Sequence, residues 1–262
     1  MSLPLPTAAS AIQTEQLRDV GFIVVSGLIP QERLAMLNRV ARAQLIARAG
    51  PLEFEADLQY PGAPQSREDV GGETVRRLLD AYGRDPTFRE WGTAPAVREW
   101  MEAYFREPVL MSRVHHNSLM TKHPLYGSLT GWHRDIRYWS YEREDLVSVW
   151  FALGEERVEN GALWFVPGSH RREFAADRYD EAKFFRTDLA DNAEVLRRAE
   201  SPRLAPGDAV FFHSNTLHSA GKNLSDAVKF SLVYTYHGQS NAPKPGTRTS
   251  SKPDVPLGRS ST

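Results

Sequence analysis

Three residues in the second half of the chain have the types and the spacing of a metal site. His133 and Asp135 are two positions apart, and residues with that spacing on a β-strand point to the same side. His218 follows a predicted strand that begins at Gly207-Asp208. Two imidazoles and one carboxylate on one face of a metal ion form the facial triad of non-haem Fe(II) sites, which leaves coordination positions open.

The histidines are confined to one region, and one of them competes with His218. All eight lie between His115 and His237, so we expect the chemistry in the second half of the chain and scaffold in the first. An isolated His-x-Asp is common, and the prediction therefore depends on a later partner. His213 is a rival third ligand, whose alternative role is to line the site or to form a hydrogen bond.

Lys229 and Ser231 offer a second kind of chemistry. In the run 228–236 apolar residues alternate with others, which predicts a strand with Lys229 and Ser231 on the same face. An ammonium and a hydroxyl at this spacing can bind a carboxylate through a charge-assisted hydrogen bond and a second donor. Because an unpaired ammonium inside a barrel is costly, we expect an anionic partner there. The alternative is a lysine on a solvated strand face.

The elements that position these residues follow from hydrophobic spacing and turn residues. About the first 107 residues are predicted to be mainly helical, with one short strand at 21–27 between glycines. The polar stretch 52–72, rich in Gly and Pro, is expected to be a surface loop that can overhang a site. The predicted helices are 30–49, 73–83 and 94–105, with Asp85-Pro86 as a helix start between the last two.

From about residue 108 the pattern changes to short strands separated by turns such as Asn160-Gly161 and Pro206-Gly207. This pattern predicts a mainly β fold of the sandwich, barrel or jelly-roll type in one domain, with the β core at about 108–237. We expect a charged insertion with some helix at about 171–200 and a flexible tail at 238–262. The predicted strands are 109–121, 145–153, 162–166, 208–213 and 228–237.

Composition excludes several classes of function. The 262 residues include 32 Lys and Arg against 33 Asp and Glu, so no overall basic field indicates nucleic-acid binding. No cysteine is present, which rules out disulfides, thiolate catalysis and Cys-ligated metals. No apolar run reaches the roughly 20 residues of a membrane span, and the first residues lack the features of a signal peptide. We therefore expect a cytoplasmic protein without membrane or nucleic-acid partners.

The motifs taken together resemble the phytanoyl-CoA dioxygenase family of Fe(II)/2-oxoglutarate-dependent oxygenases. No phosphate-binding loop, dinucleotide fingerprint or nucleophile elbow competes with this interpretation. The resemblance covers roughly residues 16–237 and is most specific where Asn160-Gly161 and Pro167-Gly-Ser-His170 stand between the two ligand motifs. The other matching segments are Gly21-Phe-Ile-Val-Val, Lys122-His-Pro124, Trp132-His-Arg-Asp135, Trp150, Gly207-Asp208, His218, Asn223 and Ser225.

The resemblance implies a double-stranded β-helix, cupin-like, with helices packed on one side, and iron bound by His133, Asp135 and His218. Lys229 occupies the position of a family Arg that holds the far carboxylate of 2-oxoglutarate, and it lacks the bidentate fork of Arg. Ala220 replaces a residue that is often polar, so Ser231 becomes the expected hydroxyl partner. Arg134, in the middle of the His-x-Asp motif, and Trp150 are further expected co-substrate contacts, although Trp150 can equally be a core aromatic residue.

The reaction implied by the resemblance is hydroxylation of a small molecule with O₂ and 2-oxoglutarate, releasing succinate and CO₂. Because the carboxylate ligand Asp135 is present, hydroxylation is favoured over halogenation. A catalytically silent cupin-like binding protein and a metal hydrolase with the same three ligands are the alternatives. A polar or anionic substrate is favoured if several of the residues around the first metal motif line the pocket: Arg113, His115, His116, Arg134, Arg137 and Tyr138. Oligomeric state cannot be read from the sequence.

Overall fold

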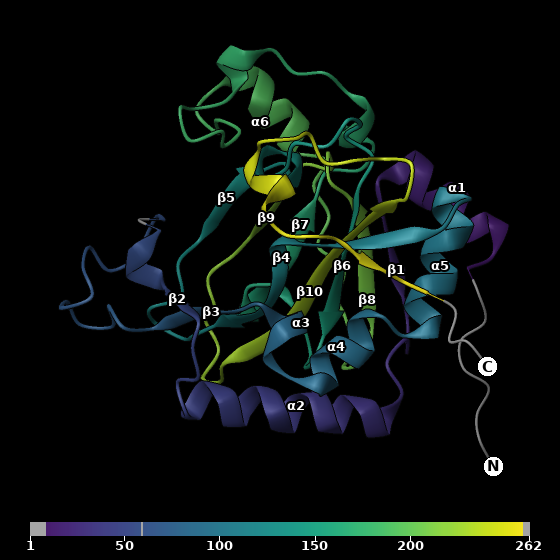
Figure 1. Ribbon diagram of the computed structural model, residues 1–262. Helices are drawn as coiled ribbons and strands as arrows, with labels where there is room; N and C mark the ends of the chain where they lie inside the picture. Colours follow the sequence, from purple (N-terminus) through teal and green to yellow (C-terminus); the bar gives the residue numbers. More distant parts are fainter. Residues whose placement is uncertain (1–8, 59, 259–262) are drawn as a thin grey trace.

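Two antiparallel sheets of unequal size form the centre of the protein (Figure 1). The computed structural model describes residues 9–58 and 60–258. The larger sheet has the strand order β1-β8-β6-β10-β4-β3-β2, with β11 paired to β4, and the smaller has the order β5-β9-β7. The strands of the larger sheet are β1 (Phe22–Val25), β2 (Leu52–Phe54), β3 (Val75–Leu79), β4 (Val109–Lys122), β6 (Val147–Ala152), β8 (Ala209–His213), β10 (Lys229–Gly238) and β11 (Val255–Pro256), and those of the smaller are β5 (Thr130–His133), β7 (Leu163–Phe165) and β9 (His218–Ala220).

Strict alternation along the central strands gives the larger sheet two different faces. In β6, Val149 and Phe151 belong to the core cluster that also contains residues of the helices. Trp150 and Ala152 point the opposite way, into a second cluster that they share with Leu163 and other residues of the smaller sheet. One face is therefore covered by helices, and the other encloses the space between the two sheets.

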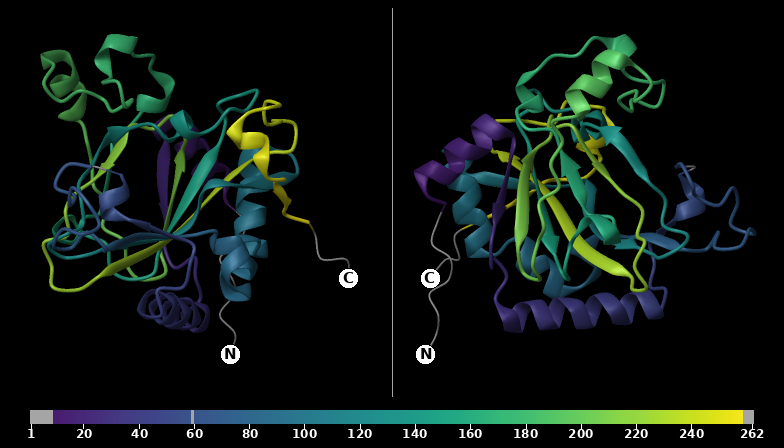
Figure 2. Two further views of the ribbon diagram at one scale, coloured as in Figure 1. Left: turned by 60° about the vertical axis from the view of Figure 1, so that its left-hand side comes forward. Right: turned by 180° about the vertical axis from the view of Figure 1, so that it is seen from behind.

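The helices of the first 107 residues cover one face of the larger sheet and one end of its strands (Figure 2). Trp100 of α5 packs on Phe211 of β8 with ring centroids 4.1 Å apart, and the hydroxyl of Tyr234 in β10 donates to the carbonyl of Phe88 in α4. None of the helices in the described part of the chain combines the length and the apolar character needed to cross a bilayer. The helices are α1 (Ala11–Val20), α2 (Gln31–Ile46), α3 (Ala81–Arg84), α4 (Pro86–Gly92), α5 (Pro95–Phe105) and α6 (Ala190–Leu196).

This architecture is the predicted double-stranded β-helix with helices on one side. The predicted strands in the second half are confirmed within two residues at most ends. The predicted helix at 73–83 is wrong, because Val75–Leu79 forms β3 and only Ala81–Arg84 is helical. Strand β3 pairs with β2 on one side and β4 on the other, and such long-range pairing overrides the local helical spacing. Part of the expected loop at 52–72 is β2, so the first 107 residues also contribute strands to the larger sheet.

The polar C-terminal segment is docked on the fold rather than flexible. Strand β11 pairs with β4, and the side chain of Leu257 joins the core. His237 Nε2 lies 3.0 Å from Oδ2 of Asp254, and the Tyr141 hydroxyl donates to the same carboxylate. These long-range contacts differ from the flexible tail that the polar composition of 238–262 predicted, and residues 259–262 lie outside the described part. The charged segment 171–200 contains α6 at the opposite end of the molecule from α2 (Figure 1).

Replacing Leu257 with Ala should destabilise the protein by about 2–5 kcal/mol, the usual cost of truncating a buried leucine. The free energy of unfolding in urea measures this effect. Leu224→Ala is the matched control, because the Leu224 side chain is 80% exposed and its truncation should leave stability unchanged. An unaltered urea midpoint for Leu257→Ala would show that the segment does not dock in solution.

Candidate metal centre

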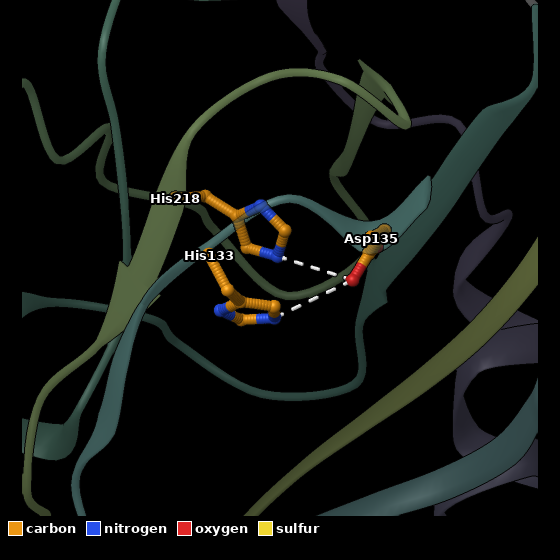
Figure 3. Close-up of side chains that lie close together, drawn as sticks. All are labelled: His133, Asp135 and His218. Atoms are coloured by element: carbon orange, nitrogen blue, oxygen red, sulfur yellow. Dashed lines mark ion pairs between the residues drawn. The ribbon is translucent and has the colours of Figure 1, made fainter. Parts of the chain in front are cut away.

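Three side chains converge at one end of the smaller sheet (Figure 3). His133 ends β5, His218 begins β9, and the two residues are direct partners in the antiparallel pairing of these strands. Asp135 begins the 3₁₀ turn Asp135–Tyr138. The Nε2 atoms of His133 and His218 each lie 3.5 Å from Oδ1 of Asp135, and all three residues are buried.

Backbone contacts orient both imidazoles toward Asp135. Nδ1 of His133 donates to the carbonyl of Gly131 at 2.8 Å, and Nδ1 of His218 donates to the carbonyl of Thr216 at 2.9 Å. Nδ1 of each ring therefore carries a proton, and both Nε2 atoms face the carboxylate. Oδ1 of Asp135 has no hydrogen-bond partner among the described residues. Two imidazole nitrogens and one unpartnered carboxylate oxygen are the donors that a ferrous ion requires, so the residues fit the metal.

The second oxygen of Asp135 is held by residues outside the triad. Nε2 of His116 lies 2.9 Å from Oδ2, and the Ser148 hydroxyl donates to the same oxygen at 3.4 Å. His116 reaches this position because the pairing of β4 with β10 shifts between Asn117 and Ser112, which leaves 113–116 as a bulge. Bulges of this kind redirect side chains next to active sites. The sequence marked His116 as a pocket candidate but carried no sign of its contact with Asp135.

The protonation states suit a metal ligand set. Burial, assisted by the neighbouring His218, lowers the pKa of His133 to about 4, so this imidazole is neutral near pH 7. Burial alone would raise the pKa of Asp135, but the neighbouring imidazoles of His116, His218 and His133 outweigh it and hold the pKa well below its usual range. For His218 burial opposes and Asp135 favours the charged form, and the net effect is a raised pKa. A metal ion at the triad competes with that proton.

A cavity between the two sheets connects the triad to an unusually cationic wall. The triad residues form one part of its lining, together with Tyr138. The opposite part includes the predicted co-substrate residues Trp150, Lys229 and Ser231. Three more cations from β3 and β4 complete this lining: Arg76, Arg77 and Lys122. The sequence did not single out Arg76 or Arg77 and marked Lys122 only as part of a segment that matches the family, because buried cations on two strands look like solvated strand faces.

The predicted co-substrate residues meet a carboxylate of the protein itself. Nζ of Lys229 lies 2.8 Å from Oε2 of Glu156, while the Ser231 hydroxyl at 2.5 Å and the indole nitrogen of Trp150 at 2.6 Å donate to Oε1. Glu156 is only 1% exposed, and its backbone is bridged to Leu204. The anionic partner expected for Lys229 is thus present within the fold. Nothing in the sequence around Glu156 distinguishes it from an ordinary polar turn residue.

The side chains of two other sequence candidates, Arg134 and His213, belong neither to the triad nor to the lining of the cavity. The guanidinium of Arg134 donates to the carbonyls of Ser169 and Arg172, both at 2.6 Å, and Arg134 does not line the cavity. A co-substrate contact from Arg134 therefore has no geometric support. Nε2 of His213 lies 3.6 Å from Asp145 and is not part of the convergent group, which is His133, Asp135 and His218 among the described residues.

Comparison with known sequences assigns the chain to a class and then to a family. A double-stranded β-helix with a buried His-Asp-His group is the arrangement of non-haem iron oxygenases. The sequence model of the family described as phytanoyl-CoA dioxygenase (PhyH) matches residues 17–231. The chain belongs to this family of Fe(II)/2-oxoglutarate-dependent dioxygenases, as its motifs suggested.

Individual relatives are distant but cover most of the chain. An ectoine dioxygenase from Bordetella parapertussis is 25% identical over 258 residues, 91% of this chain and 78% of that protein. A probable phytanoyl-CoA dioxygenase from Caenorhabditis elegans is 22% identical, covering 82% of this chain and 71% of its own length.

Solved structures share the fold at similarly low identity. EctD from S. alaskensis, in complex with 2-oxoglutarate and 5-hydroxyectoine, matches with a TM-score of 0.74 and 19% identity over 93% of this chain and 81% of its own. The epimerase SnoN, in complex with Fe³⁺, α-ketoglutarate and nogalamycin RO, matches with a TM-score of 0.71 and 21% identity over 88% of this chain and 84% of its own. The fold is therefore one on which other chains bind iron and a 2-oxoacid.

Proposed function

We propose that this protein hydroxylates a small polar or anionic organic molecule, using Fe(II), 2-oxoglutarate and O₂ and releasing succinate and CO₂. The observation that supports this most directly is the convergence of two imidazole Nε2 atoms and the unpartnered Oδ1 of Asp135 on one wall of a cavity. Ferrous iron held there supplies O₂ activation coupled to oxidative decarboxylation of the 2-oxoacid. Cytoplasmic location and the absence of nucleic-acid partners stay predictions from the sequence.

In this proposal the chain's own residues orient the ligands and keep water out. His116 and Ser148 hold Oδ2 of Asp135, so that Oδ1 stays directed at the two imidazoles. Leu163 and Phe212 give the cavity an apolar wall beside the triad, which excludes water and strengthens the charge interactions within it. Trp150, Lys229 and Ser231 form the proposed co-substrate end of the cavity, and Glu156 fixes their positions from behind.

A groove next to the metal cavity supports the polar or anionic character of the substrate. Arg77 and Tyr138 line both spaces, so the groove leads to the triad. Arg113 and His115 from the β4 bulge and Arg248 from the C-terminal segment line the groove as well. Arg77 and Arg113 lie within ion-pair distance of Glu53 and Asp80, which line the same groove. Arg248 has no ion-pair partner among the described residues, and its guanidinium suits a carboxylate or phosphate of a substrate.

The test is succinate release by protein loaded anaerobically with Fe(II), against a panel of small carboxylates, phosphates and neutral analogues. We expect succinate formation that depends on O₂ and equals the amount of a product that is one oxygen atom heavier than the substrate. If no compound of the panel leads to succinate formation and the protein does not bind 2-oxoglutarate, the silent binding protein is favoured. Product formation by water addition without O₂ uptake would favour the metal hydrolase.

Arg248→Gln should raise KM for an anionic substrate about tenfold, the effect of losing one charge-assisted hydrogen bond. Because Arg248 lines the groove and not the metal cavity, KM for 2-oxoglutarate should not change. Initial rates of succinate formation at varied substrate and co-substrate concentrations separate the two values. Arg39→Gln, an exposed arginine on α2 outside the groove, is the control and should change neither KM.

A further inference from the structure

The cavity contains two lysines directly opposite each other on neighbouring strands. Lys122 of β4 and Lys229 of β10 are partners in the antiparallel register, so their side chains project from the same face of the sheet. Both residues line the cavity, and they are only 7% and 8% exposed. Like charges opposite each other destabilise a sheet, and burial increases the cost. This pair therefore needs counter-ions.

The fold supplies a counter-ion to only one of the two lysines. Glu156 lies 2.8 Å from Nζ of Lys229 and is also bonded by Ser231 and Trp150, which leaves that ion pair without net charge. Among the described residues, the ion pairs of the cavity wall join Arg76 to Glu55, Arg77 to Glu53 and Lys229 to Glu156, and none of them involves the ammonium of Lys122. The Lys122 side chain packs against Gly161, where an added Cβ would lie 3.2 Å from its Cε.

The other two cations of the wall are already engaged. Arg76 lies 2.9 Å from Glu55 and also donates to Ser128 and Thr130. Arg77 lies 3.1 Å from Oε1 of Glu53. Burial, with the nearby charges of Arg76 and Lys229, lowers the pKa of Lys122 well below its ordinary value. Glu55 and Glu156 attract the ammonium of Lys122 from farther away, but they are paired directly with Arg76 and Lys229. Lys122 is thus the cation of the described cavity wall without a carboxylate at ion-pair distance.

We propose that Lys122, and not Lys229, receives the far carboxylate of 2-oxoglutarate. The Lys229–Glu156 pair then serves as an internal ion pair that shapes the co-substrate end of the cavity. This inference rests on the proposed function and revises the role expected for Lys229 from the family resemblance. The incoming carboxylate supplies the negative charge that the Lys122–Lys229 pair lacks, because the fold itself provides one carboxylate for two ammonium groups.

The test compares two 2-oxoacids that differ only in the far carboxylate. Protein loaded with Fe(II) under anaerobic conditions is titrated calorimetrically with 2-oxoglutarate and with 2-oxopentanoate, for the unaltered chain and for Lys122→Met. Met keeps an unbranched side chain that is one atom shorter and removes the charge. We expect Lys122→Met to weaken 2-oxoglutarate binding roughly ten- to a hundredfold, the effect of one hydrogen bond between charged groups. Its affinity for 2-oxopentanoate should equal that of the unaltered protein.

Lys222→Met, at an exposed lysine outside the cavity, is the control and should bind both acids normally. Lys122→Gln gives a second uncharged variant if Lys122→Met does not fold. The assignment would be overturned if the Lys122 variants bound 2-oxoglutarate with unchanged affinity and Lys229→Met bound it more weakly. That result would show that Lys229 leaves Glu156 to bind the co-substrate. An unaltered protein that binds neither acid would instead overturn the proposed function itself.

Discussion

His218→Ala is expected to abolish Fe(II)-dependent succinate formation while the protein remains folded. The change removes one of three ligand atoms that lie within 4.8 Å of one another, and the two remaining residues cannot complete a facial set. Iron content after dialysis, O₂ uptake and succinate release measure the loss. Asp135→Ala and His133→Ala should behave in the same way, because each supplies one ligand atom.

His213→Ala is the matched control, since its imidazole faces Asp145 and takes no part in the triad. This variant should retain iron and activity. Loss of iron in His213→Ala with retention in His218→Ala would reverse the ligand assignment. His116→Ala should give an intermediate result, about a 10- to 100-fold loss of metal affinity, because it removes a partner of Asp135 and not a ligand.

The triad could be predicted from the sequence because its geometry depends on local rules. The His-x-Asp spacing predicted that His133 and Asp135 meet, and the motif order around Asn160-Gly161 limits where the distal histidine falls. The expected reason was wrong in part, because β5 ends at His133 and Asp135 lies in the following 3₁₀ turn and not on a strand. In the structure His133 and His218 are register partners across β5 and β9. The structure thus adds the pairing to a ligand set that local patterns already indicated.

The remainder of the site depends on pairings between distant segments, which local patterns do not encode. Glu156 meets Lys229 across 73 positions, and Arg76 meets Glu55 across 21. His116 reaches Asp135 only because four residues of β4 bulge out of register. Strands β3 and β11 were missed for the same reason, since each is defined by its partner β4 and not by its own composition.

Lys229→Met should lower the free energy of unfolding by about 3–5 kcal/mol, because it leaves the buried carboxylate of Glu156 without its cation. Lys122→Met should leave the free energy of unfolding unchanged or raise it, since it removes an unpartnered ammonium and the repulsion across the register pair. Equilibrium unfolding in urea without co-substrate measures both effects. Two buried lysines that face each other on adjacent strands thus have opposite expected effects on stability.

The double variant Lys229→Met with Glu156→Gln separates loss of the ion pair from loss of packing. Removing both charges should restore much of the stability lost in Lys229→Met, because the amide oxygen introduced by Glu156→Gln can still accept from Ser231 and Trp150 without a buried charge. Destabilisation of Lys122→Met as large as that of Lys229→Met would mean that Lys122 has a counter-ion inside the fold. The cavity would then have no unmet positive charge, and the far carboxylate of the co-substrate would need a different partner.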